Sequence, residues 1–139
     1  MWSRREEVDY ALQRRNTLQA LRGPRIVLTG SDVCDADPLL LRAAMHHGEE
    51  SGVSCPICDQ ERLVNLNYVF GDQLGQYSGR IKSTPELIDM QSEFGEFKVC
   101  VVEVCVECGW NHMIQSYLLG DGVRRRPPRR QQTVEDIYG

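Results

Sequence analysis

The sequence has no long hydrophobic run. Its longest apolar stretches fall far short of the ~20 residues needed to span a bilayer, and the arginines of residues 1–7 have no apolar segment behind them. We therefore expect neither a membrane span nor a secretion signal. Six cysteines without such a signal favour thiols in a reducing cytoplasm.

Common catalytic and nucleotide-binding motifs are missing as well. The chain has no G-x-x-x-x-G-K-[ST] loop, no G-x-G-x-x-G and no G-x-S-x-G, and no catalytic pair stands out among its acidic residues. A ribonucleoprotein-type aromatic stripe is also missing, so base-specific reading is not supported. These absences favour a protein that is not an enzyme and has no evident small-molecule substrate.

The net charge of −4 is unevenly distributed. Residues 1–25 carry six arginines against three acidic residues, and residues 108–139 carry five against three. Between them, residues 26–107 carry five basic against fourteen acidic residues. An acidic centre with basic ends argues against nucleic-acid binding over the whole surface, so any such contact should use the ends.

Two C-x-x-C pairs are the most informative feature that the chain does have. They are Cys55–Cys58 and Cys105–Cys108, with 46 residues between Cys58 and Cys105. A tetrahedral metal needs four soft ligands, and two tight turns supply two sulfurs each. We predict one structural zinc per chain, bound by Cys55, Cys58, Cys105 and Cys108. Two disulfides, another metal or a redox dithiol stay open as alternatives.

Other candidate ligands have simpler interpretations. Four cysteinates would fill the zinc coordination sphere and leave no position for an activated water. His112 could replace a cysteine, but a strand histidine with a local hydrogen bond beside Trp110 is the plainer interpretation. A second metal site could be built from five other residues, Cys34, Asp35, Asp37, His46 and His47. Helix capping is the better explanation for this set.

Capping signals predict three helices. Ser3 and Glu6 form a capping box that opens a helix over residues 3–22. Asp37 followed by Pro38 opens a second helix that ends near Gly48, before a polar loop over residues 49–54. A further capping box at residues 83–86 begins a helix that ends at residue 95, which accounts for the long spacing between the C-x-x-C pairs.

Hydrophobic patterns predict the strands. Residues 63–70 alternate as a half-buried strand, residues 97–104 are apolar on both faces as a central strand, and residues 110–119 return antiparallel to it. A short strand is also expected over residues 76–82. The predicted fold class is α+β, with a small antiparallel sheet built around a four-cysteine zinc ribbon, two N-terminal helices and one inserted helix.

The predicted organisation is one zinc-ribbon domain over residues 1–122, with an N-terminal helical part over about 3–48. Residues 123–139 lack apolar periodicity and are expected to form a flexible Arg/Pro-rich tail. The C-x-x-C turns should lie at the ends of hairpins, with strands leading away from the metal.

Arginines mark two candidate partner-binding segments. In the first helix, Arg14 and Arg15 share a side with apolar residues, so they either lay their stems on apolar surface or dock on acidic groups of this protein or a partner. The tail would bind phosphate or an acidic surface, or would be merely solvated. Its arginines are Arg124, Arg125, Arg126, Arg129 and Arg130.

Many separate segments resemble an uncharacterised actinobacterial family of short cytosolic proteins, known as a domain of unknown function. The resemblance covers roughly residues 4–130. The segments that carry it include Val33-Cys34-Asp35-Ala36-Asp37-Pro38, Leu40-Leu41-Arg42-Ala43-Ala44, Cys55-Pro56-Ile57-Cys58, Phe70-Gly71-Asp72, Cys108-Gly109-Trp110-Asn111-His112 and Ser116-Tyr117. It implies a lineage and a four-cysteine zinc ribbon, but no activity.

These features lead to three functional hypotheses. The first is a non-enzymatic zinc-binding module that docks on transcription or translation machinery, of the RNA polymerase or ribosome class, through its ribbon and its arginine-rich ends. The second is a protein–protein adaptor that uses its first helix and does not contact nucleic acid. The third is a thiol-redox protein or another enzyme whose site is not recognisable in the sequence.

Overall fold

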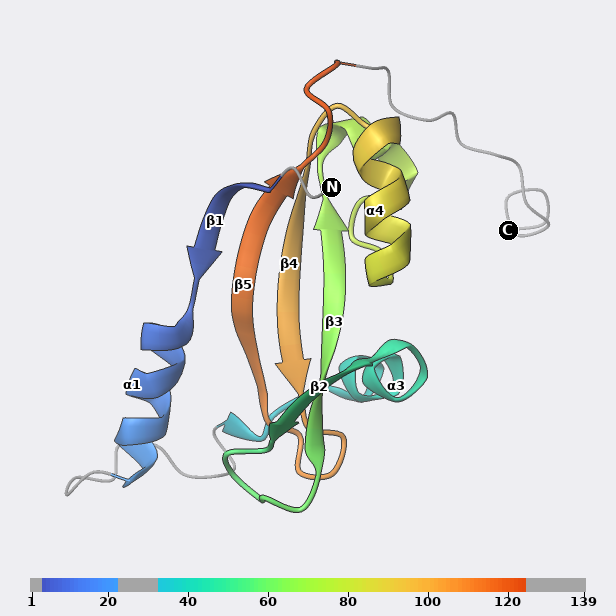
Figure 1. Cartoon of the computed structure of the whole chain (residues 1–139). Helices are drawn as coiled ribbons and strands as arrows, with labels where there is room; N and C mark the ends of the chain where they lie inside the picture. Colours follow the sequence, from blue (N-terminus) through green and yellow to red (C-terminus); the bar gives the residue numbers. More distant parts are fainter. Residues whose placement is uncertain (1–3, 23–32, 125–139) are drawn as a thin grey trace.

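A computed structural model describes residues 4–22 and 33–124 of the chain (Figure 1). Its five strands form one antiparallel sheet in the order β1-β5-β4-β3-β2. The elements in chain order are β1 Arg5–Asp9, α1 Ala11–Arg22, α3 Pro38–His47, β2 Glu49–Ser54, β3 Arg62–Phe70, the 3-10 helix η1 Asp72–Tyr77, α4 Thr84–Glu93, β4 Phe97–Val104 and β5 Asn111–Leu119. The α+β class is confirmed.

Two hairpins make up most of the sheet. One joins β2 to β3, the other joins β4 to β5, and β3 pairs with β4 between them. The strand expected to be central, β4, lies in the middle of the five. Its residue Val99 stands opposite Val69 of β3 and Tyr117 of β5, and all three are buried. The apolar pattern of β4 reflects burial on both faces.

Helix α4 and η1 cover one face of the sheet, and α4 lies in front of it in Figure 1. The expected capping box is present, because the Ser83 side chain accepts from the Glu86 backbone N–H and the Glu86 carboxylate accepts from the Ser83 N–H. Leu87 and Met90 of this helix pack with Phe97 and Val99 in a buried cluster. Local capping and burial of one apolar side therefore place the inserted helix.

Helix α3 covers part of the opposite face. Asp37 caps it by accepting a hydrogen bond from the Leu40 N–H, as predicted, and Ala44 packs against Leu66 and Val104. Beside α3 lies a groove of about 640 Å³, lined by residues that include Leu39, Tyr68, Phe70, Cys100 and Met113. Cys100 on the wall of this groove is buried, with 7% of it exposed.

The helix predicted over residues 3–22 is wrong in its first part. Arg5–Asp9 form strand β1, which pairs with β5 through Val8 opposite Ser116 and Asp9 opposite Gln115. The helix begins only at Ala11, where the Asp9 carboxylate accepts from the Ala11 N–H at 2.7 Å. Pairing with β5 supplies partners for strand backbone groups, and this outweighs the local capping pattern of Ser3 and Glu6. Ser3 itself lies outside the described residues.

Two further local assignments need correction. Residues 49–54, expected to be a polar loop, form the edge strand β2, whose burial pattern is mostly exposed. The strand expected over residues 76–82 is replaced by η1 and a single bridge between Ile81 and Tyr68. An edge strand needs no strong apolar alternation, because partner backbone groups on one side hold it.

The predicted domain end is anchored to the sheet region. The backbone N–H of Asp121 donates to Phe94 O at 3.2 Å, and that of Gly122 donates to Gly95 O at 2.9 Å. Of the tail assigned to residues 123–139, only Val123 and Arg124 lie within the described residues. A search of the described helices finds none with the length and apolar character to cross a bilayer.

Candidate metal centre

The first C-x-x-C pair lies in the tight turn that joins β2 to β3. The Asp59 N–H donates to Cys55 O at 3.1 Å, and the Ile57 N–H points at Cys55 Sγ at 3.4 Å. The Cys55 N–H in turn donates to Glu61 O at 2.9 Å, which closes the loop. Asp59 has φ +54°, so the chain reverses sharply directly after the second cysteine.

The second pair repeats this geometry between β4 and β5. The Gly109 N–H donates to Cys105 O at 3.0 Å, the Cys108 N–H points at Cys105 Sγ at 3.5 Å, and the Cys105 N–H donates to Trp110 O at 2.8 Å. Gly109 has φ +90°, in the position that Asp59 occupies in the first turn. Each hairpin thus presents two sulfurs from a rigid turn at its end.

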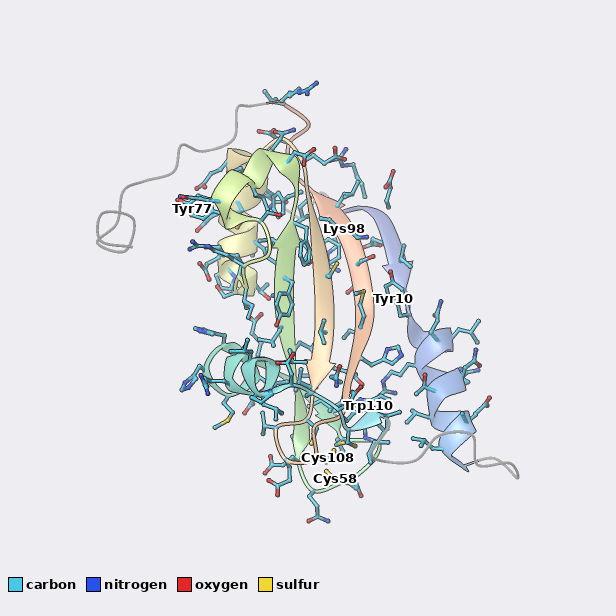
Figure 2. The ribbon with its side chains drawn as sticks, turned by 180° about the vertical axis from the view of Figure 1, so that it is seen from behind. Tyr10, Cys58, Tyr77, Lys98, Cys108 and Trp110 are labelled. Atoms are coloured by element: carbon cyan, nitrogen blue, oxygen red, sulfur yellow. The ribbon has the colours of Figure 1, made fainter. Side chains whose placement is uncertain are left out.

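The two turns meet at one end of the sheet, where Figure 2 labels Cys58 and Cys108 close together. The sulfurs of Cys55, Cys58, Cys105 and Cys108 all lie within 4.8 Å of one another. Across the two turns, Cys55 Sγ is 3.6 Å from Cys108 Sγ, and Cys58 Sγ is 3.6 Å from Cys105 Sγ. These four cysteines therefore lie close enough to bind one metal ion.

The sulfur spacing fits a metal centre better than disulfides. All six cysteines of the chain are free. A disulfide would require about 2.05 Å between sulfurs, whereas four thiolates about 2.3 Å from one tetrahedral ion would lie about 3.8 Å apart. The observed 3.6 Å separations are near the second value.

The surroundings of the sulfurs shift the pKa values of their thiols in different directions. Burial raises the pKa of the Cys108 thiol and also that of Cys105. The pKa of Cys58 is lowered, first by the backbone hydrogen bond from Gln60. Buried thiolates are stabilised by a bound metal ion, which deprotonates them as it binds. A metal would therefore overcome the burial effect on Cys105 and Cys108.

Trp110 forms the wall between the metal centre and the sheet. It is fully buried, and it belongs to a cluster with Cys55, Cys105 and Leu63. Its indole Nε1–H donates to Glu103 Oε2 at 2.6 Å. This hydrogen bond satisfies the only polar atom of the indole and fixes the ring beside the second C-x-x-C turn.

His112 is not part of the cysteine cluster. Its ring stacks on Trp110 with centroids 5.9 Å apart, and its Nδ1 donates to Met113 O at 2.6 Å. The interpretation as a strand histidine with a local hydrogen bond is confirmed.

The residues weighed as a second metal site do not gather around a common point. Asp37 caps α3, Asp35 accepts from Asn111 Nδ2 at 2.9 Å, and His46 and His47 occupy the last turn of α3. Within the described ranges, only the four C-x-x-C cysteines form a group with metal-binding spacing. The predicted capping by Asp37 is confirmed.

Two contacts of this region were not predicted from the sequence. Cys34 lies beside the centre, with its Sγ 3.5 Å from Cys108 Sγ. Glu103 is 5% exposed and holds both Trp110 and Arg14. An acidic residue inside the apolar run of residues 97–104 was the available signal for Glu103. Cys34 was weighed only for a separate second metal site, and no sequence spacing indicates its position beside Cys108.

The candidate partner-binding arginines are dispersed. Arg14 forms an ion pair within the chain, because its Nε donates to Glu103 Oε2 at 2.7 Å. Arg15, in contrast, is exposed. Arg124 lines a pocket of about 550 Å³ with Arg5, Lys98 and Glu96 among its walls. The other tail positions, Arg125, Arg126, Arg129 and Arg130, lie outside the described residues.

Comparisons with known proteins agree with the resemblance in the sequence. The model of a family of unknown function, DUF5318, matches residues 1–133. Similar relatives are the uncharacterized proteins Mb0050 of Mycobacterium bovis and Rv0049 of Mycobacterium tuberculosis, each 50% identical over 123 residues that cover 88% of both chains. No solved structure matches. The chain is therefore a member of the DUF5318 family.

Proposed function

We propose that this chain is a non-enzymatic zinc-binding module that docks on transcription or translation machinery of the RNA polymerase or ribosome class. The observation that carries the zinc assignment is the set of four sulfurs, all within 4.8 Å of one another, at the ends of two hairpins. This arrangement resembles the closed four-thiolate sites that hold structural zinc. Six free thiols fit a reducing compartment such as the cytoplasm.

A structural role for the zinc follows from its coordination. Four thiolates complete a tetrahedral ion, so no position is left for a water or a substrate. The same donor set also suits iron, and elemental analysis of protein purified without oxygen distinguishes the two metals. The ion would bridge the β2–β3 and β4–β5 hairpins at one end of the sheet, beside the buried cluster of Leu63 and Trp110.

The docking part of the proposal depends on surfaces at both ends of the sheet. β5 begins beside the second C-x-x-C turn and runs for nine residues, a span of about 30 Å for strand geometry. The pocket with Arg5, Lys98 and Arg124 lies at its far end, where Figure 2 labels Lys98. A partner that contacts both the turns and the arginine end must therefore be extended, as a large complex is.

The protein–protein adaptor is retained as a second candidate because of the groove beside α3. Leu39 is 74% exposed and Phe70 is 42% exposed on its walls. Exposed apolar side chains grouped in this way are typical of protein interaction surfaces. An adaptor of this kind would bind without any contribution from nucleic acid.

Affinity purification tests the proposal directly. The tagged full-length protein is recovered from its source cell with and without nuclease, and zinc is measured on the same sample. Near-stoichiometric polymerase or ribosomal subunits with one zinc per chain would support the module. A small unrelated partner that resists nuclease would support the adaptor, and the absence of zinc would overturn the metal assignment.

The tail arginines need a separate comparison. One variant changes Arg124, Arg125, Arg126, Arg129 and Arg130 to Gln, and a matched variant changes them to Lys. If all five meet nucleic-acid phosphates, the logarithm of the binding constant falls with the logarithm of salt with a slope of about −3.5 to −4.5. The Gln variant should lose this slope and the Lys variant should keep it. Equal binding by wild type and the Gln variant would remove the tail from the interface.

A further inference from the structure

Cys34 contacts the metal centre from outside its ligand set. Its Sγ lies 3.5 Å from Cys108 Sγ, as near as the ligand sulfurs lie to one another across the two turns. Cys34 does not belong to the group of four sulfurs that are mutually within 4.8 Å. It is therefore a fifth thiol placed against one ligand of a complete site.

The segment that carries Cys34 is fixed to the second C-x-x-C turn by three contacts. The Ala36 N–H donates to Gly109 O at 3.1 Å, and Asn111 Nδ2 donates to Asp35 Oδ1 at 2.9 Å. A Cβ at position 109 would lie 3.1 Å from Cys34 O, so the two backbones touch where Gly109 stands. Val33 is also buried in the cluster around Trp110. These contacts hold the two sulfurs together.

The two cysteines of this contact are among the accessible ones of the centre. Cys34, Cys58 and Cys108 are partly exposed, whereas Cys55 and Cys105 are buried. A small oxidant can therefore reach Cys34 and its neighbour Cys108 before it reaches Cys55 or Cys105. Formation of a bond between them requires the two sulfurs to approach from 3.5 Å to about 2.05 Å.

We propose that Cys34 is an oxidative modification site of the metal centre, at which a hydroperoxide drives formation of a Cys34–Cys108 disulfide and release of the metal. The metal-release part rests on the proposed zinc site, whereas formation of the disulfide does not. The contact between the two sulfurs and the three contacts that hold it are the observations behind the proposal.

The reaction balances in two steps. Hydrogen peroxide transfers one oxygen to the Cys34 thiol, which gives a sulfenic acid and one water. The Cys108 thiolate then attacks the Cys34 sulfur, the new S–S bond forms, and hydroxide leaves. Two electrons pass from the two sulfurs to the peroxide. The ion keeps only three cysteine ligands and is held more weakly.

The test uses the full-length, zinc-loaded protein and hydrogen peroxide. Zinc content is measured before oxidation, zinc release is followed with a chromophoric chelator, and disulfides are mapped after cleavage by a glutamate-specific protease. Cleavage after Glu103 and Glu107 places Cys100, Cys105 and Cys108 in different peptides, so their disulfides can be told apart. A reductant with added zinc should restore the starting state.

Wild type should release zinc as the Cys34–Cys108 disulfide forms in equal amount. Cys34→Ser and Cys34→Ala should bind zinc normally but release it at least about tenfold more slowly, because the only thiols left at the centre are metal-bound thiolates. Cys100→Ser is the matched control, since it removes a buried thiol that lies outside the cysteine cluster and should behave as wild type.

Several outcomes would overturn the inference and leave the zinc site intact. Release at the wild-type rate from Cys34→Ser is one, and a wild-type disulfide that excludes Cys34 is another. Failure of wild type to bind zinc at all would instead contradict the proposed function. In that case the disulfide map of the metal-free protein still decides whether Cys34 pairs with Cys108.

Discussion

The guanidinium of Arg14 donates to the buried carboxylate of Glu103, with 2.7 Å between Nε and Oε2. The same carboxylate oxygen accepts from the Trp110 indole at 2.6 Å. Glu103 therefore connects α1 to the central strand and to the wall of the metal centre. A carboxylate that is 5% exposed is tolerated in this position because two donors, one of them charged, compensate for its loss of water.

Removal of this carboxylate should destabilise the fold. Glu103→Ala leaves the Arg14 charge and the Trp110 N–H without their shared acceptor, so the free energy of unfolding should fall by about 3 kcal/mol. This is the low end for breaking a buried pair, because the Arg14 side chain is 24% exposed. Urea denaturation of the zinc-loaded proteins measures the change.

The matched control is Glu96→Ala, at the exposed ion pair with Arg5. Its effect should stay below about 0.5 kcal/mol, because exposed pairs contribute little. If Glu103→Ala lowers the free energy of unfolding no more than Glu96→Ala does, then Glu103 does not connect the elements as described.

Metal removal should loosen one end of the sheet first. At free zinc a thousandfold above its dissociation constant, binding contributes about 4 kcal/mol to stability. Trp110 is fully buried beside the cysteines, so chelation should shift its fluorescence to longer wavelength. The chain has two tryptophans, so the measurement uses a Trp2→Phe background.

The far cluster around Val99, Phe97 and α4 does not contain the cysteines and should retain its far-ultraviolet circular dichroism. Cys105→Ser provides the control, since it should show the shifted fluorescence before any chelator is added. An unchanged Trp110 signal in both experiments would argue that no metal organises this end.

A side chain at position 109 should disturb the contact with Cys34 in addition to straining the backbone of residue 109. Gly109 and Gly79 share φ +90°, but a Cβ at Gly79 meets nothing within 4 Å, whereas one at Gly109 meets Cys34 O at 3.1 Å. Gly79→Ala should therefore cost about 1 kcal/mol from strain alone. Gly109→Ala should cost more and should also weaken zinc binding.

Thermal unfolding and competition with a zinc chelator measure these two effects. Equal stability losses for the two variants, with equal zinc affinity, would show that the contact of residues 33–36 with the turn contributes neither to stability nor to zinc binding.

The capping box of α4 predicts a pH dependence. The backbone hydrogen bond from Ser83 is the main cause that holds the pKa of Glu86 below its ordinary value of 4.5. Because the folded-state pKa is lowered, the stabilisation is complete above the unfolded value and is lost as the pH falls through the folded value. Glu86→Gln should remove this part of the pH dependence.

Urea midpoints of wild type and Glu86→Gln at pH 6 and at about pH 3 check the prediction, because the unfolded carboxylate titrates near the ordinary value. Loss of zinc in acid affects both proteins alike, so the difference between them isolates the cap. A gap between the two proteins that stays constant with pH would contradict the assignment.

Much of the candidate metal centre and of the sheet could be predicted from local patterns. The two C-x-x-C pairs mark their own turns, and the alternation of residues 63–70 and the doubly apolar residues 97–104 mark β3 and β4. The caps at Asp37 and Ser83 were also recognisable. Each of these signals lies within a few residues of the structure it specifies, because turns, caps and strand periodicity are short-range effects.

Edge elements could not be assigned in this way. Residues 5–9 satisfy a helix-capping pattern with Ser3 and Glu6, yet they form β1, because β5 offers them a row of backbone partners. Residues 49–54 are polar and mostly exposed, yet they form β2 for the same reason. In both cases the partner strand decides the conformation and the segment's own side chains do not.

The local order of residues thus specified the four cysteines that cluster, the hairpins that carry them and the capped helices. Tertiary structure alone placed Cys34 against Cys108, which is 74 residues away, and Arg14 against Glu103, which is 89 residues away. Neither contact has a spacing rule, since each depends on how separate elements pack around Trp110. Long-range packing therefore decided which thiol borders the metal centre and which charge supports it.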